Sequence, residues 1–239
     1  MKNVCIVMIG MVCLTSMVQA GISTFSPTAD SYIRENDTTS STHGAEIIMV
    51  TNNGTGTNKI RWSFVRFDLS GITETITGIK FELQASKEGG ITPALTHAVY
   101  GLTTGEDWTE SGLNFTNAPA RSAKTVDMAG VFGGAALSTF SYTGAVSGNI
   151  GGPVAAVIDQ AAGGLAADFI NADSNKIITF IIARTGDPSS AGYGIAWATK
   201  EKTYANVAAP LLTVYTIPEP ANLIILGLGG LILRRKKSK

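Results

Sequence analysis

Aromatic and basic side chains occur together at the start of one alternating segment of this 239-residue chain. Trp62 follows Lys59 and Arg61, and the run Ser63–Leu69 comes directly after it. An indole ring can stack on the C–H face of a sugar, while polar and charged neighbours bind its hydroxyl groups. Strict alternation puts Trp62 with Phe64 on the face opposite the core, so we expect the indole to point outward. Lys59, Arg61 and Trp62 are therefore our candidate glycan-binding residues, with packing at a sheet edge as the alternative.

The other two tryptophans favour structural roles. Trp108 stands in the motif Asp107–Glu110, where we expect its indole to pin a loop and Glu110 to cap nearby backbone donors. Trp197 lies between Ala196 and Ala198 in an apolar run, which predicts a core or half-buried position.

Four acidic residues lie close together near the start of the chain: Asp30, Glu35, Asp37 and Glu46. Calcium takes six to eight oxygen ligands, and carboxylates supply them. The segment has none of the spacing of a dedicated calcium loop, so a solvated acidic loop is the default interpretation. We predict no metal site and no cofactor, with a structural calcium ion at these acids as the alternative.

Catalytic motifs are absent from the sequence. The only histidines, His43 and His97, are too few for a zinc site, and we expect surface or strand positions for both. No Gly-x-Ser-x-Gly elbow supplies a serine nucleophile. Two carboxylates from distant strands can still converge to cleave a glycosidic bond, so this possibility stays open.

Period-two alternation predicts a mainly β domain with many short strands. Alanine-rich Val154–Asn171 has apolar residues at helical spacing and predicts one or two short helices broken at Gly163 and Gly164. The glycine-rich stretch Gly130–Gly152 predicts a long surface connection. Together these features predict an antiparallel two-sheet sandwich. The expected strands are Ala45–Thr51, Ser63–Leu69, Ile79–Ala85, Thr96–Leu102, Ile177–Ala183, Tyr193–Thr199 and Leu211–Tyr215.

The first 20 residues have the pattern of a secretory signal peptide. Lys2 precedes an apolar stretch from Val4 to Val18, and small residues lead to a cleavage site between Ala20 and Gly21. A permanent N-terminal anchor is the alternative. Both cysteines, Cys5 and Cys13, lie in this segment, so the mature protein has no disulfide, no cysteine nucleophile and no thiolate metal site.

The last 23 residues form a second sorting element. Pro218-Glu219-Pro220 precedes the apolar run Ala221–Leu233, and a basic cluster that begins with Arg234 and Arg235 follows. Proline stops helix continuation from upstream, and a basic cluster stays on the cytoplasmic side. The run has 13 residues, whereas an unassisted span needs about 20. A short, transient membrane helix fits better than a permanent anchor.

This tail resembles the PEP-CTERM sorting signal of Gram-negative bacteria. The resemblance rests on the Pro218-Glu219-Pro220 motif, the glycine-containing apolar helix and the arginine-rich end. It implies that an exosortase, a membrane cysteine transpeptidase, cleaves near the motif and that the protein reaches the cell envelope or extracellular matrix. Signal peptidase would act at the other end. We thus divide the chain into a signal peptide (1–20), one domain (21–216) and a sorting signal (217–239).

The net charge of the central domain limits the classes of partner that it can bind. Lys2 and five basic residues of the tail account for six of the 18 basic residues, and Glu219 for one of the 18 acidic ones. Residues 21–216 therefore carry a net charge of about −5. Such a domain is a poor candidate for nucleic acid, which selects basic surfaces, and its charge disfavours polyanionic polysaccharides.

The central domain also resembles a known family. Four motifs appear in the order found in the DNRLRE domain, which is carbohydrate-binding module family 96. Phe115 stands where that family has a second tryptophan. The resemblance implies a jelly-roll β-sandwich and sugar binding. The motifs are Ala29–Arg34 (ADSYIR), Ser63–Ser70 (SFVRFDLS), Asp107–Pro119 (DWTESGLNFTNAP) and Ala209–Tyr215 (APLLTVY).

The sequence predicts a non-catalytic, exported protein whose β module binds or supports polysaccharide. Its expected partners are signal peptidase, exosortase, an extracellular polysaccharide and, transiently, the membrane. A polysaccharide lyase or glycosidase on the same scaffold is one alternative. A passive structural protein of the matrix without a ligand is the other.

Overall fold

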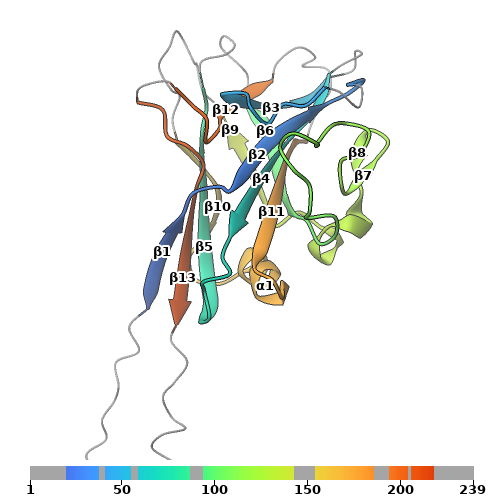
Figure 1. Cartoon of the computed structure of the whole chain (residues 1–239). Coiled ribbons are helices and arrows are strands. Elements are labelled where there is room, and N and C mark those ends of the chain that lie inside the picture. Colours follow the sequence, from blue (N-terminus) through green and yellow to red (C-terminus); the bar gives the residue numbers. More distant parts are fainter. Residues whose placement is uncertain are drawn as a thin grey trace, which may run out of the picture.

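The protein is described here from a computed structural model, which covers residues 20–37, 41–54, 59–86, 94–142, 154–185, 194–203 and 206–217. This part of the chain is mainly β, with one α-helix, as the sequence predicts (Figure 1). The strands are β1 (Gly21–Phe25), β2 (Ala29–Arg34), β3 (Ile48–Asn53), β4 (Ile60–Asp68), β5 (Thr75–Gln84), β6 (Leu95–Gly101), β7 (Arg121–Ser122), β8 (Thr125–Val126), β9 (Ser138–Tyr142), β10 (Val154–Gln160), β11 (Ile177–Arg184), β12 (Ile195–Ala198) and β13 (Leu211–Ile217). The helix is α1 (Leu165–Ala172), and the 3₁₀ turns are η1 (Met128–Gly130) and η2 (Phe132–Gly134).

The smaller of the two large sheets has four antiparallel strands in the order β1-β13-β5-β10. Alternation of apolar and polar residues along β5 explains why one face of this sheet packs against the core. Ile79, Phe81 and Leu83 are fully buried on one face, whereas Lys80 and Glu82 form a 2.7 Å ion pair on the other. The prediction of a half-buried strand at this segment is confirmed.

The larger sheet has seven strands, in the order β12-β3-β4-β11-β6-β9, with β2 also paired to β4. Its central strand, β11, is apolar on both faces. Phe180 and Ile182 enter the main core, while Ile181 and Ala183 face the other way into a second apolar cluster. This confirms the expectation of a central strand. The jelly-roll connectivity stays a prediction.

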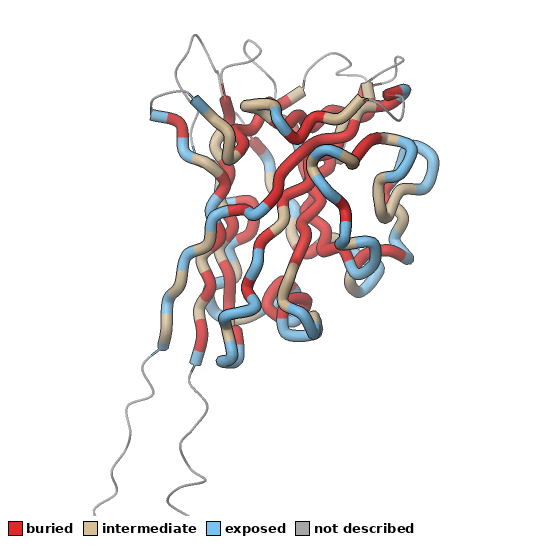
Figure 2. Tube along the Cα trace, in the orientation of Figure 1, coloured by how far each residue is buried: buried red, intermediate tan, exposed pale blue. Residues whose placement is uncertain are grey.

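The main core fills the space between the two sheets. Phe67 and Phe180 of the larger sheet meet Phe81 of the smaller one, with ring centroids 5.1 to 6.1 Å apart. Buried residues lie along the inner strands of the domain, and exposed residues lie at the turns and in the segment after β6 (Figure 2). The described residues contain no cysteine, so no disulfide lies within the part of the core that the structure describes.

The outer face of the larger sheet is covered by an irregular segment, residues 102–136, which we call the cover segment. It lies against β4 and β11 on the side away from the smaller sheet (Figure 1). Its Trp108, Leu113 and Val131 pack with Trp62 and Phe64 of β4 in a second apolar cluster. The larger sheet is therefore buried on both faces.

The prediction of helix at Val154–Asn171 is wrong over its first half. Residues Val154–Gln160 form β10, which pairs with β5, and only Leu165–Ala172 is helical. A bulge between Ala156 and Ile158 turns the side chains of Val157 and Ile158 to the buried side together. Two adjacent apolar residues in a bulged strand imitate helical spacing.

The expected long surface connection at Gly130–Gly152 is also wrong in its described part. Turn η2 and strand β9 lie within it, and β9 pairs with β6. Residues 143–153, like the signal peptide up to residue 19 and the sorting motif with its basic end, lie outside the described residues. Among the described residues, no helix has the length and apolar character that a membrane crossing requires.

The first and last strands of the domain lie side by side. Gly21 of β1 is the register partner of Thr216 of β13, so the two ends of the described fold lie at one edge of the smaller sheet (Figure 1). Whatever precedes residue 21 and follows residue 217 is attached to the domain at neighbouring points.

Candidate functional site

The predicted glycan residue Trp62 is on the expected face, but it does not point into solvent. Its side chain shares the second apolar cluster with Phe64, and only 3% of the residue is exposed. The expectation of an outward indole is wrong because the cover segment packs over that face. Trp62 still lines a hollow of about 330 Å³, which we call the Trp62 pocket, together with Tyr100, Lys124 and Arg184.

Lys59 and Arg61 do not join Trp62 in one site. Arg61 follows the alternation to the opposite face of β4, where its register partners are Arg34 and Asn52. Lys59 precedes the strand, and its backbone N–H donates to Glu35 at 3.3 Å. The three residues are neighbours in sequence, but alternation along the strand divides them between two faces.

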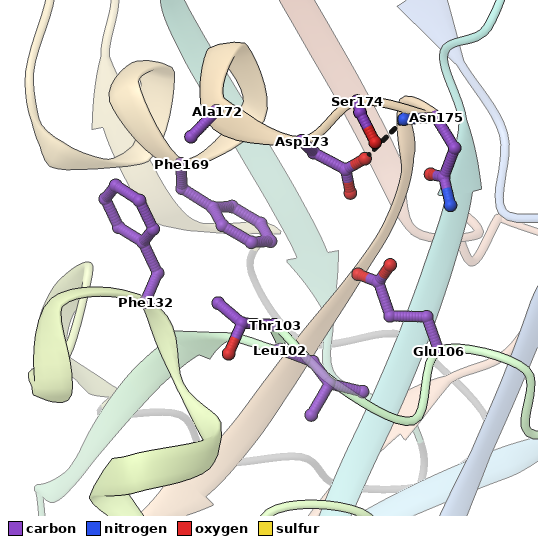
Figure 3. A pocket seen from close by; sticks show the side chains of 9 residues that line it. All are labelled: Leu102, Thr103, Glu106, Phe132, Phe169, Ala172, Asp173, Ser174 and Asn175. Atoms are coloured by element: carbon purple, nitrogen blue, oxygen red, sulfur yellow. Dashed lines mark hydrogen bonds between the residues drawn. The ribbon is translucent and has the colours of Figure 1, made fainter.

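A second hollow, which sequence analysis missed, combines aromatic rings with carboxylates. This Phe132 pocket has a volume of about 340 Å³ and is formed by the loop after β6, by η2 and by the C-terminal end of α1. The rings of Phe132 and Phe169 form one side of it, and the side chains of Glu106, Asp173 and Asn175 lie across from them (Figure 3). Thr103, Leu102, Ala172 and Ser174 complete its lining.

Local structure fixes the aromatic side of the Phe132 pocket. Phe169 packs over Gly101 at the end of β6, where a Cβ atom would come within 2.8 Å of the ring. Glycine is therefore needed at that position for close approach. The ring also contacts Phe132 and Phe180, with centroids 5.7 and 5.8 Å away, which ties the pocket to the main core.

The polar side of the pocket comes from the end of α1. Asp173 accepts hydrogen bonds from the backbone N–H groups of Asn175 and Lys176 at 2.8 and 3.0 Å, and these bonds shape the turn into β11. The Lys176 ammonium donates to the carbonyl oxygens of Ile170 and Asn171, near the negative end of the helix. The Asp173 carboxylate is thus held by local contacts, and so is the Asn175 amide, whose oxygen accepts from the backbone N–H of Ile177 at 2.7 Å.

Glu106 has the most perturbed carboxyl group of the pocket. Burial raises its pKa to about 7, the nearby charge of Asp173 adds to the rise, and Arg66 partly opposes it. Figure 3 shows the Glu106 carboxylate pointing toward Asp173 and Asn175. Within the described residues, Oε1 of Glu106 is buried without a hydrogen-bond partner. A bound hydroxyl group would supply one.

An adjoining hollow extends the pocket into a longer groove. It measures about 430 Å³, shares Glu106 and Asn175 with the Phe132 pocket, and is also lined by Thr28, Arg66, Asp68, Asp107 and Ile177. Arg66 anchors the wall of this groove. Its guanidinium donates to the carbonyl oxygens of Glu106 and Trp108 at 3.2 and 2.7 Å and lies 5.1 Å from the Trp108 ring centroid.

The structural roles predicted for the other two tryptophans are confirmed. Trp108 is 8% exposed, and its Nε1–H donates to the Thr179 hydroxyl at 3.1 Å, so the indole pins the cover segment to β11. Glu110 accepts from the backbone N–H of Asp30 at 2.8 Å. Trp197 is fully buried and donates to the Thr51 hydroxyl at 3.2 Å.

The four acids near the start of the chain do not form one cluster. Asp37 and Glu46 flank His43 at 2.7 and 2.5 Å, Glu35 pairs with Lys124, and Asp30 lies elsewhere, beside Lys200. A single calcium site made of all four is therefore excluded.

The expectation that both histidines are surface or strand residues holds only for His97, which lies in β6. His43 lies in the loop before β3 and is buried, with its ring stacked on Tyr32 at a centroid distance of 4.0 Å. Contacts of its two ring nitrogens with the carboxylates of Asp37 and Glu46 explain this buried position.

Two antiparallel sheets that carry a surface groove of aromatic, carboxylate and amide groups define a β-type binding module. The chain belongs to carbohydrate-binding module family 96, whose family model matches residues 21–182. No curated protein matches the chain. The family assignment confirms the resemblance of the central domain, and family 96 modules are non-catalytic binding domains.

Proposed function

We propose that this protein is exported and sorted to the cell envelope or extracellular matrix, where its family 96 module binds a neutral polysaccharide along the groove between Phe132 and Arg66. One observation carries the glycan proposal. The Phe132 pocket places two aromatic rings opposite a buried, unpartnered carboxylate oxygen of Glu106.

The chemistry of the groove suits sugar hydroxyl groups. Phe132 is half-buried and offers ring surface to C–H groups, while Glu106, Asp173 and Asn175 offer acceptors and an amide. Acidic side chains, Asp68 and Asp107 among them, also line the extension. Arg66, the one arginine of that lining, already donates to two backbone carbonyls. A polyanion would meet net negative charge here, and we therefore propose a neutral chain.

The length of the groove favours a polymer. Two hollows that share Glu106 and Asn175 provide adjoining sites for successive sugar units. The Trp62 pocket is a single hollow whose indole is almost fully buried, and its Lys124 pairs with Glu35. We therefore assign the glycan to the groove and use the Trp62 pocket as the comparison.

Affinity electrophoresis of the full chain in mild detergent, in gels that contain neutral or acidic polysaccharides, tests the proposal. We expect neutral polysaccharide to retard the protein, and Phe132→Ala and Glu106→Gln each to weaken binding by about tenfold. Trp62→Phe is the matched control and should leave retardation within about twofold. If Trp62→Phe loses retardation while Phe132→Ala keeps it, the binding site is the Trp62 pocket and not the groove. Equal mobility in every gel would favour a passive structural protein.

The sorting proposal rests on the two ends of the chain. The signal pattern up to Ala20 and the Pro218-Glu219-Pro220 tail support export and exosortase processing. The pairing of β1 with β13 supports it further, because both processing sites would lie near one edge of the domain. Signal peptidase, exosortase and a transient membrane contact are the partners implied.

Replacing the Pro218-Glu219-Pro220 motif with three alanines tests the sorting role. Unprocessed protein should accumulate in the inner membrane, and normal surface release of the variant would contradict the proposal.

Removal of residues 234–239 should let the apolar run slip through the bilayer. Intact-mass analysis of the secreted protein would then find the run retained.

A second function, glycoside cleavage, is favoured by one observation. Glu106, with its pKa raised to about 7, faces the carboxylate of Asp173 in the pocket, and glycosidases use such a pair as acid and base or nucleophile. Product analysis separates the two functions. Binding alone releases no oligosaccharide, whereas cleavage releases it, and Glu106→Gln would then stop release more strongly than it weakens retardation.

A further inference from the structure

Three carboxylates from distant parts of the chain meet at residues that line neither hollow of the groove. They belong to Asp30 at the start of β2, to Glu110 of the cover segment and to Glu201 in the turn after β12. One oxygen of each lies within 4.8 Å of the others, a spacing that one cation can bridge. Sequence patterns grouped Asp30 with other acids, marked Glu110 as a cap of backbone donors and did not single out Glu201.

Two oxygens of this cluster are not satisfied by protein contacts. Asp30 is fully buried, and within the described residues its Oδ1 has no hydrogen-bond partner; the same holds for Oε2 of Glu201. The other Asp30 oxygen accepts from the backbone N–H of Lys200 at 2.7 Å, which holds the carboxylate in place. A buried carboxylate oxygen without a partner is costly, so each such atom indicates a missing ligand.

The charge of the cluster is not balanced by the side chains around it. The ammonium of Lys200 contacts Glu110 at 2.8 Å and also contacts Glu201, but it is one positive charge among three carboxylates. Burial raises the pKa of Asp30 to about 7, the hydrogen bond and the charge of Lys200 partly oppose the rise, and the charges of Glu201 and Glu110 add to it. A dication would neutralise the charge that Lys200 leaves.

We propose that Asp30, Glu110 and Glu201 bind a divalent cation of the calcium type. Calcium prefers carboxylate oxygens, accepts irregular geometry and completes its shell with water or carbonyl groups. The cation would join β2, the cover segment and the turn after β12, and the ammonium of Lys200 would move aside when it binds. This site is separate from the glycan groove, and its proposal is independent of the proposed function.

Calcium titration of the full chain in mild detergent, after removal of divalent ions with EDTA, tests the site directly. We expect calorimetry to give one calcium ion per chain. At a concentration about 100 times the Kd, the melting temperature should rise by about 5–10 °C. Absence of both heat and a melting shift in the wild-type protein and in Lys200→Met would overturn the proposal.

Three variants locate the ion. Glu201→Gln changes a side chain that is 28% exposed and should not prevent folding, and it should lower calcium affinity at least about tenfold. Asp30→Asn should do the same if it folds. Lys200→Met removes the competing ammonium, so it should bind calcium more tightly and melt at a lower temperature in EDTA. An affinity in Lys200→Met that is equal to or weaker than that of the wild type would contradict competition by the lysine.

A matched control uses the other acidic cluster of the domain. Glu46→Gln removes a carboxylate from the group around His43 and should leave calcium affinity unchanged. If Glu46→Gln lowers affinity as much as Glu201→Gln does, the ion does not bind at the three carboxylates and the proposal fails.

Discussion

The two faces of the seven-stranded sheet are buried in different ways. The inner face packs against the four-stranded sheet through side chains that alternate regularly, such as Phe67, Phe81 and Phe180. The outer face is buried by the irregular cover segment, which individual polar contacts hold in place, among them those of Arg66 and Trp108. Regular packing produces a closed apolar core, whereas irregular packing leaves hollows and brings charged groups together.

The chemistry of the molecule gathers where the packing is irregular. Glu106 of the groove and Glu110 of the carboxylate cluster both belong to the cover segment. Their partners come from other elements, Asp173 from the end of α1 and Asp30 from β2. The regular half of the domain thus supplies stability, and the irregular half supplies the candidate sites.

The largest effect should come from the inner face. Phe180→Ala removes a fully buried ring that contacts Phe67, Phe81 and Phe169, and it leaves a cavity. We expect a loss of about 3–5 kcal/mol in the free energy of unfolding. Denaturant unfolding followed by tryptophan fluorescence measures it. Ile22→Ala, at a residue 66% exposed, is the control and should change stability by less than about 0.5 kcal/mol.

A smaller effect, confined to one region, should follow from Arg66→Ala on the outer face. The change removes two charged hydrogen bonds and a cation–π contact from the cover segment. We expect a loss of about 2–3 kcal/mol. Hydrogen exchange should rise chiefly in residues 103–120. A rise in hydrogen exchange that is uniform across both sheets would show that the inner and outer faces of the seven-stranded sheet are not energetically distinct.

Arg121→Ala is the matched comparison for that experiment. Arg121 lies 4.6 Å from the Phe115 ring centroid and donates to the carbonyl oxygen of Ala123 at 2.9 Å. Among the described residues, these contacts join parts of the cover segment to one another and not to the seven-stranded sheet. The change should cost less than about 1 kcal/mol. A loss as large as that of Arg66→Ala would mean that contacts within the cover segment, and not its anchors to the sheet, hold it in place.

Sequence patterns predicted the regular half of the domain because alternation is a local signal. The strands around Phe67, Phe81 and Phe180 follow directly from period-two runs. The error at Val154–Gln160 came from a bulge, which shifts the period by one residue and depends on pairing with β5. Pairing is a long-range property that alternation alone does not reveal.

The candidate sites could not be predicted for a related physical reason. Trp62 was expected outward because nothing in its own strand indicates that residues 102–136 cover that face. Glu106 and Asp173 lie 67 positions apart in sequence and meet only through the folded topology. The motif Asp107–Pro119 was a usable signal, since it marked Trp108 and Glu110 as anchors and so located the segment that carries Glu106.

The last expected effect is a pH dependence that belongs to the regular half. His97 is buried beside Phe140 and Trp197, where its Nδ1–H donates to the Leu95 carbonyl at 3.0 Å and its Nε2 accepts from the Thr51 hydroxyl at 2.9 Å. Burial lowers the pKa of His97 from 6.5 to about 4, and the charge of Arg184 contributes. Between these values the unfolded chain binds more protons than the folded one, so stability rises with pH and is lost as pH falls from 6.5 toward 4.

His97→Gln isolates this contribution, because it keeps a polar side chain and removes the titrating group. The stability of the wild type relative to the variant should fall by at most about 1.4 kcal/mol per pH unit between pH 6.5 and 4. Glu106 and Asp30, whose raised pKa values give the opposite slope, are present in both proteins and cancel in the difference. Urea unfolding at half-unit pH intervals measures it. Parallel curves for the two proteins would mean that the His97 ring is already open to water, and the regular core would then be less closed than the inner face of the sheet indicates.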